Sequence, residues 1–225
     1  TASGNGTFNT IARASSISSV TSSVSVNGTS AVTVNITRAS SSFTHTVVFS
    51  FGSYSKTTTG VGTSTSYAIP TSWLNAIPSA TSGTAKVTVT TYSGSTKIGS
   101  AVSKSFTLTV PSTVVPTISA VTLSEAVSGL ATQFGGYVQG KSKIAVKITA
   151  AGALSSTIKT YKTTIQGANF TAASFTSGVL TKSGTSNVTI TVTDSRGRTA
   201  STTRSITVNA YTAPKISKFT AVRAN

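Results

Sequence analysis

The stretch Val188-Thr-Ile-Thr-Val192 alternates apolar and hydroxyl side chains with a period of two, which is the pattern of a half-buried β-strand. Turn sequences such as Asn27-Gly28 and Arg196-Gly197 separate segments of this kind. Short strands divided by frequent turns predict an all-β fold of the sandwich type. The same alternation recurs at Val32, Val34 and Ile36, at Val87 and Val89, at Phe106, Leu108 and Val110, and at Ile144, Val146 and Ile148.

An internal sequence repeat indicates the number of sandwich domains. Pro116-Thr-Ile-Ser-Ala-Val-Thr122 and Pro214-Lys-Ile-Ser-Lys-Phe-Thr220 repeat one pattern 98 residues apart, which is the length of one sandwich domain. The 225 residues suffice for two such domains. We therefore predict two tandem immunoglobulin-like β-sandwich domains joined by a short Pro-containing linker. Their ranges are 1–110 for domain 1, 111–116 for the linker, 117–210 for domain 2, and 211–225 for a second linker and the first strand of a truncated following domain.

Local signals add detail to this plan. Each half is predicted to end in a long hairpin, with arms at 85–92 and 95–110 in the first half and at 187–193 and 198–208 in the second. The one helical turn predicted covers residues 71–77 between Pro70 and Pro78, with Thr71 or Ser72 as its cap. The absence of Met and the strand-like stretch at 215–223 suggest a fragment of a longer polypeptide.

The inventory of chemical groups argues against an enzyme. Glu125 and Asp194 are the only acids, they are 69 positions apart, and there is no cysteine. The single histidine, His45, alternates with Phe43 and Val47 and is interpreted as a core residue. We therefore expect no catalytic residue, no metal and no cofactor, and we interpret residues 194–198 as a hairpin turn, not as a cation site. No run of 18 apolar residues occurs, so no membrane insertion is expected.

The positive net charge of the chain favours anionic partners. The 18 Lys and Arg residues give a formal net charge of +16, although only 9% of residues are charged. Lys141, Lys143 and Lys147 form the densest local patch and share one strand face, although lysines on a solvated sheet face also prevent edge pairing. A nucleic-acid site normally concentrates basic residues on one face with aromatics interleaved for stacking. Because the basic residues here are dispersed, specific nucleic-acid binding is not expected.

Aromatic side chains are the second candidate binding feature. Tyr54, Tyr67 and Trp73 provide flat rings on which a sugar can stack. The alternative is burial, because Trp73 adjoins Leu74 and Ile77 and a Trp of this kind commonly closes the end of a sandwich.

Several longer stretches resemble a known family. They include Arg38-Ala-Ser-Ser-Ser-Phe-Thr-His-Thr46, Tyr137-Val-Gln-Gly-Lys-Ser-Lys143 and Thr193-Asp-Ser-Arg-Gly-Arg-Thr-Ala200. They are similar to segments of the minor structural and tail proteins, some fibre-like, of tailed bacteriophages that infect Gram-positive bacteria. The resemblance covers nearly the whole chain. It implies a virion component exposed outside the cell, and it carries over no catalytic residue.

Two functional hypotheses follow. The first is a structural or adhesion module of a phage virion, in the tail or a fibre. Its partners would be other virion proteins or further copies of the chain, and anionic polymers or glycans of a Gram-positive cell wall. The alternative, which depends on Trp73, is a carbohydrate-binding appendage of a secreted or phage-borne cell-wall hydrolase.

Overall fold

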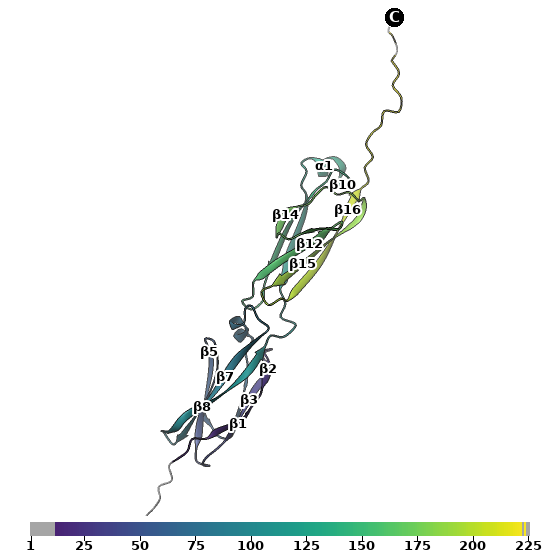
Figure 1. Ribbon diagram of the computed structural model, residues 1–225. Helices are drawn as coiled ribbons and strands as arrows, with labels where there is room; N and C mark the ends of the chain where they lie inside the picture. The colour runs from purple at the N-terminus through teal and green to yellow at the C-terminus, as the bar shows by residue number, and fades with distance from the viewer. Residues whose placement is uncertain (1–11, 222, 224–225) are drawn as a thin grey trace, which may run out of the picture. The chain divides into compact units, whose positions relative to one another are not determined.

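The computed structural model describes residues 12–221 and 223, which form two compact units. The main segment of unit 1 runs to Val115, and unit 1 also includes the short segments Ala153–Thr157 and Ser195–Arg198. The remaining residues from Pro116 onward form unit 2. Figure 1 labels most of the strands of the two units.

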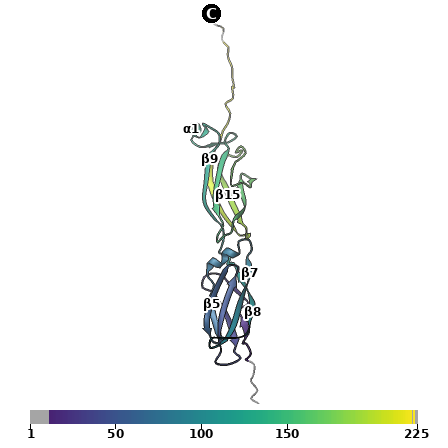
Figure 2. The same cartoon turned by 90° about the vertical axis from the view of Figure 1, so that its left-hand side faces the viewer.

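Unit 1 is a sandwich of two sheets. The smaller sheet has the order β1-β3-β6, with β1 at Ser16–Val20, β3 at Ala31–Thr37 and β6 at Ser64–Ala68. The larger sheet has the order β2-β8-β7-β4-β5, and several of its strands run side by side in Figure 2. Its strands are β2 at Ser23–Ser25, β4 at Thr44–Phe51, β5 at Tyr54–Val61, β7 at Ser82–Ser93 and β8 at Thr96–Thr109.

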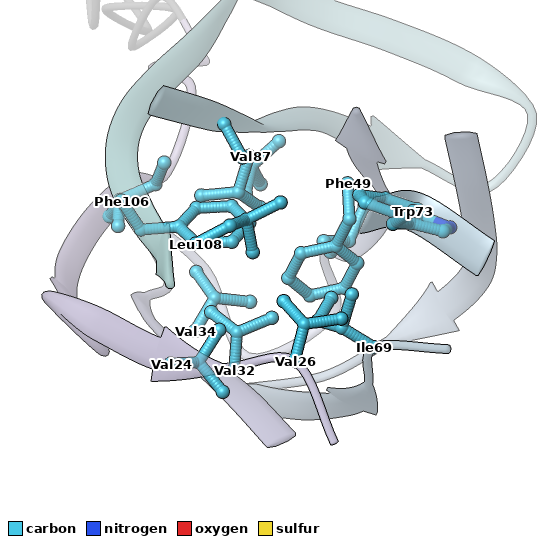
Figure 3. Close-up of a cluster of buried hydrophobic side chains, with 14 of the residues drawn as sticks. Val24, Val26, Val32, Val34, Phe49, Ile69, Trp73, Val87, Phe106 and Leu108 are labelled. Atoms are coloured by element: carbon cyan, nitrogen blue, oxygen red, sulfur yellow. The ribbon is translucent and has the colours of Figure 1, made fainter. Parts of the chain in front are cut away.

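The core of unit 1 follows from the alternation in the sequence. Val32, Val34 and Leu108 are completely buried, while the hydroxyl residues between them face outward or lie at the margin. Figure 3 shows side chains of both sheets pointing toward one another, with Phe49 and Trp73 beside them. Burial of this apolar surface stabilises the unit by about 25 cal/mol per Å². The core therefore joins the two sheets.

The predicted helical turn is present, but its cap differs from the prediction. It is a 3-10 helix at Thr71–Ala76, and the residue at its N-cap position is Pro70, with no side-chain cap hydrogen bond. The prediction that Thr71 or Ser72 caps the turn is therefore wrong. A proline at this position fixes φ near −65°, which is the value observed, so the ring defines the start of the turn without a hydroxyl cap.

Unit 2 has two sheets of the same kind. The smaller has the order β14-β11-β9, with β9 at Thr117–Glu125, β11 at Ile144–Ala151 and β14 at Ser174–Thr176. A short helix that the sequence did not predict, α1 at Leu130–Phe134, precedes β10. The larger sheet has the order β10-β16-β15-β12-β13, with β10 at Tyr137–Val138, β12 at Ile158–Ile165, β13 at Ala168–Phe170, β15 at Gly184–Asp194 and β16 at Thr199–Asn209.

The two units have one topology. In each, the first strand pairs antiparallel with the next long strand, as β1 with β3 and β9 with β11. In each, a short strand near the start pairs parallel with the last strand, as β2 with β8 and β10 with β16. This arrangement is typical of immunoglobulin-like sandwiches. The all-β prediction of two such sandwiches is confirmed, as are the two hairpins, β7 with β8 and β15 with β16.

Candidate functional site

The outer face of the smaller sheet in unit 2 carries two rows of hydroxyl side chains. The central strand β11 pairs Ala145 with Ser124 on one side and with Thr176 on the other. It pairs Lys147 with Thr122 and Ser174 in the same way. Residues directly opposite one another in a ladder share a face, so each row crosses three strands. Each row therefore has two hydroxyls around one central side chain.

These rows line a hollow of about 360 Å³. The methyl group of Ala145 is the smallest side chain of the two rows, and Ala145 is one of the residues that line the hollow. Val146 faces the core and is buried, as the alternation requires. The hollow therefore combines four hydroxyls, a small apolar floor and the ammonium group of Lys147. We name it the β11 hollow.

The predicted lysines lie along this face. Lys143 and Lys147 are each two residues from Ala145, so by strand geometry they are about 7 Å from it in opposite directions. Both are exposed. Lys141 is also exposed, but its Nζ atom lies 5.4 Å from the centre of the Tyr211 ring. A cation–π contact of this kind restrains the side chain.

Other lysines that are close in sequence lie elsewhere. Lys159 and Lys162 are exposed on β12, which belongs to the larger sheet of unit 2. The structure therefore separates them from the sheet that holds Lys147. Lys159 and Lys162 carry the same positive charge as Lys147 and belong to the same unit, but they do not lie beside the two hydroxyl rows.

The acids do not line the β11 hollow. The Glu125 Oε1 atom accepts hydrogen bonds from the backbone amides of Val127, at 2.9 Å, and Lys143, at 3.2 Å. Burial raises the pKa of the nearby Tyr137 phenol, and the negative charge of Glu125 raises this pKa further. Asp194 is completely buried at the end of β15. The hollow therefore presents cationic and hydroxyl groups without a carboxylate among its lining residues.

The aromatic candidates belong to the core of unit 1. Trp73 is only 3% exposed and packs among the buried residues shown in Figure 3. Its ring centroid lies 6.0 Å from that of Tyr54 and 5.8 Å from that of Tyr67. Both tyrosines are partly buried against the same core, and burial raises the pKa of Tyr67. The burial alternative is therefore the one observed for Trp73, and its faces are not available to a sugar.

The remaining groups with chemical potential are also part of the fold. His45 is 1% exposed, and its Nδ1 atom lies 2.9 Å from the carbonyl oxygens of both Val61 and Gly62, so it is the predicted core histidine. Asp194 ends β15, and residues 195–198 form the predicted turn between β15 and β16, with Gly197 at φ +79°. In the described part of the chain, no group of three or more His, Cys, Asp or Glu could hold a metal ion.

The lysines near this site are recognisable from the sequence, but its hydroxyls are not. Ser124 and Thr176 are 52 residues apart, and only strand pairing brings both beside Ala145. In a chain this rich in Ser and Thr, no local signal distinguishes these hydroxyls from the others. Knowledge of the register was needed to find them.

The comparisons with known proteins place the chain in a family. All 225 residues match the family described as "Siphovirus protein of unknown function (DUF859)". The chain belongs to this siphovirus family. The resemblance to proteins of tailed phages is thereby confirmed at the level of a siphovirus protein, and the family supports a structural protein of the phage as the broad class. No curated protein matches this siphovirus protein.

Several solved structures are similar to the siphovirus protein at low identity. The fibronectin(III)-like modules of Clostridium thermocellum CbhA share 14% identity at a TM-score of 0.33, covering 87% of this chain and 94% of theirs. A tetra-tandem repeat from the extending region of a large adhesion protein shares 17% at 0.38, covering 87% of this chain and 48% of its own. Cadherin domains 3–6 of protocadherin gamma B2 share 11% at 0.34, with 87% and 47% covered. This chain thus spans about half the length of the last two. At these scores the likenesses say nothing of function.

In the residues that the structure describes, no helix has the length and apolar character needed to cross a membrane.

Proposed function

We propose that this siphovirus protein is a non-enzymatic structural and adhesion module of the virion, in the tail or a fibre, that binds anionic polymers of a Gram-positive host cell wall through the β11 hollow. The observation that carries the proposal is the hydroxyl-lined hollow with Lys147 in its lining, together with the exposed Lys143 just before the start of β11. Within the particle, we expect its other contacts to be with virion proteins or further copies of the chain.

The chemistry of the hollow favours a polyanion that also carries hydroxyls, such as a teichoic acid. The Cα atoms of Lys143 and Lys147 are about 13 Å apart along a strand, so two ammonium groups can meet two charges of one polymer chain. The Ser and Thr hydroxyls between them can donate to and accept from polyol or sugar groups. Each exposed ion pair contributes at most about 1 kcal/mol, so useful affinity requires several repeats along the polymer.

The non-enzymatic part of the proposal is supported by the positions of the acid and base groups. His45 and Asp194 are buried, and Glu125 accepts two backbone amides. The alternative of a hydrolase appendage depended on Trp73 as a sugar platform. Because that ring is buried, no observation favours the alternative.

The test is sedimentation of the purified chain with Gram-positive cell walls, with and without teichoic acids, across a salt titration. The double variant Lys143→Gln/Lys147→Gln is compared with Lys159→Gln/Lys162→Gln, which removes the same charge from the other sheet of unit 2. We expect the first variant to bind about three- to tenfold more weakly and the second to bind close to the unmodified chain. Equal losses in both, or retention that survives teichoic-acid removal, would reject the β11 hollow as the binding site.

A further inference from the structure

Two large apolar side chains near the end of unit 2 are almost fully exposed. Ile216 is 88% exposed and Phe219 is 86% exposed, whereas the other exposed large hydrophobics of the described residues reach at most 43%. Residues 212–221 lie in no helix or strand. Isolated exposed apolar residues are ordinary, but two so exposed within four positions indicate a surface that is covered in another context.

The same short sequence pattern occurs at the start of each unit. Ile216-Ser-Lys-Phe-Thr220 matches Ile118-Ser-Ala-Val-Thr122 in β9 of unit 2, as the sequence indicated. The structure adds a third copy, Ile17-Ser-Ser-Val-Thr21, which contains most of β1. The three copies are 101 and 98 residues apart. In both units that are folded here, the copy belongs to the first strand of a sandwich.

A β-bulge at the same position explains the unusual spacing of the apolar residues. In β1, Ile17 pairs with Ile36 but Ser19 pairs with Asn35, so Ser18 is an extra residue. In β9, Ile118 pairs with Ala150 but Ala120 pairs with Thr149, so Ser119 is the extra residue. Residues three apart on a regular strand face opposite sides, and one extra residue brings both to the same side.

The burial of the two folded copies agrees with this geometry. Ile17 is buried, and Val20 packs against the same core cluster. Ile118 and Val121 both pack against the core of unit 2. The residues that correspond to Lys215 and Lys218 are exposed in both units: Ser16 and Ser19 in unit 1, Thr117 and Ala120 in unit 2. The third copy therefore has apolar residues at the two core positions and lysines at the two solvent positions.

We propose that residues 216–220 are the bulged first strand of a third β-sandwich of the same polypeptide, with Ser217 as the bulge residue. Ile216 and Phe219 would pack in its core, and an antiparallel strand equivalent to β3 and β11 would pair with them. The nearly constant spacing of the three copies argues for a further repeat of this chain as the partner, and not for an unrelated protein. This inference concerns how the chain is built and is independent of the β11 hollow.

The test supplies a sandwich that lacks its own first strand. Residues 1–220 are expressed with a second copy of residues 123–209 attached directly after Thr220, so that 216–220 occupies the place of 118–122. A matched chain carries a second copy of residues 116–209 instead and shows that a repeat folds at this position. We expect hydrogen exchange at 216–220 to slow by at least about a hundredfold in the first chain, relative to the unextended protein.

Two variants test the bulge itself. Deletion of both Ser217 and Lys218 in the extended chain should abolish this protection, because Ile216 and Phe219 then become neighbours that face opposite sides. Deletion of Ser217 alone should retain it, because Ile216 and Phe219 are then two apart on a regular strand and still face the same side. Units 1 and 2 remain as internal references for folding. The proposal is overturned if residues 216–220 exchange as fast as in the unextended protein while the matched chain folds, or if deletion of both Ser217 and Lys218 leaves the protection unchanged.

Discussion

Trp73 shows how burial determines the role of a single residue. Its indole ring packs beside Tyr54 and Tyr67 and is 3% exposed, although it lies in the short 3-10 helix that follows Pro70. A large ring in this position fills the end of the sandwich core. Its neighbours are thus held by contacts that a smaller side chain could not make.

We expect Trp73→Ala to lower the free energy of unfolding of unit 1 by about 3–5 kcal/mol, through lost burial and the cavity left behind. Chemical denaturation followed by far-ultraviolet circular dichroism measures the change. Ser72→Ala, which alters an exposed neighbour, is the control and should change stability by less than about 0.5 kcal/mol. A Trp73→Ala protein as stable as the control would show that the ring is not part of the core.

The phenol of Tyr137 makes the stability of unit 2 depend on pH. Burial and then Glu125 raise the pKa of its phenol above the ordinary value of about 10. A group whose pKa is raised on folding contributes stability below its unfolded pKa, and this contribution is lost as pH rises through the folded pKa. Unit 2 should therefore lose stability as the pH rises above about 10.

Because other side chains also change charge at alkaline pH, the contribution of Tyr137 is measured by comparing the unmodified chain with variants. Unfolding of the unmodified chain and of Tyr137→Phe is followed at about pH 8 and about pH 11. We expect the unmodified chain to lose more stability between the two, and Glu125→Gln to lessen its loss. An identical pH dependence in all three proteins would contradict the assignment.

At the scale of the element, β9 depends on its bulge. The extra residue Ser119 keeps Ile118 and Val121 on the core side, and its Oγ donates to the Thr149 carbonyl oxygen at 3.2 Å. We expect deletion of both Ser119 and Ala120 to destabilise unit 2 severely, because Ile118 and Val121 then become neighbours and one of them must turn toward solvent. Ser119→Ala should cost about 1 kcal/mol or less, since only an exposed hydrogen bond is lost.

Thermal unfolding of the two variants separates the effect of the spacing between Ile118 and Val121 from that of the hydroxyl. If both variants unfold at the temperature of the unmodified chain, the placement of both apolar residues on the core side has no role in stability.

The strands differ in how far the sequence could predict them. β3, β11 and β15 alternate regularly because one side of each is buried, so period two identifies them. β5 is an edge strand with the sequence Tyr-Ser-Lys-Thr-Thr-Thr-Gly-Val, and most of its residues are exposed, so it lacks that signal. β1 and β9 have apolar residues three apart, and only their pairing with a neighbour reveals the bulge. The β11 hollow was hidden for the same reason, because register is a long-range property.

At the scale of the whole molecule, the formal net charge of +16 ensures attraction to any polyanion. Lys143→Gln/Lys147→Gln and Lys159→Gln/Lys162→Gln each lower this charge by two. We expect the two variants to elute from heparin at the same reduced salt concentration, because generic attraction follows net charge. Earlier elution of the Lys143→Gln/Lys147→Gln variant would show that these two lysines also concentrate heparin, and would weaken teichoic acid as the distinctive ligand.

The parallel pairing of β2 with β8 and of β10 with β16 has a mechanical consequence. In each unit, a strand near the beginning lies parallel to the last strand, so tension applied at the two ends of that unit pulls the paired strands lengthwise in opposite directions. All the hydrogen bonds of the pair then bear the load together, instead of opening one after another. Each sandwich is thus built to resist stretching between its two ends, a property that the proposed role in a tail or fibre would require.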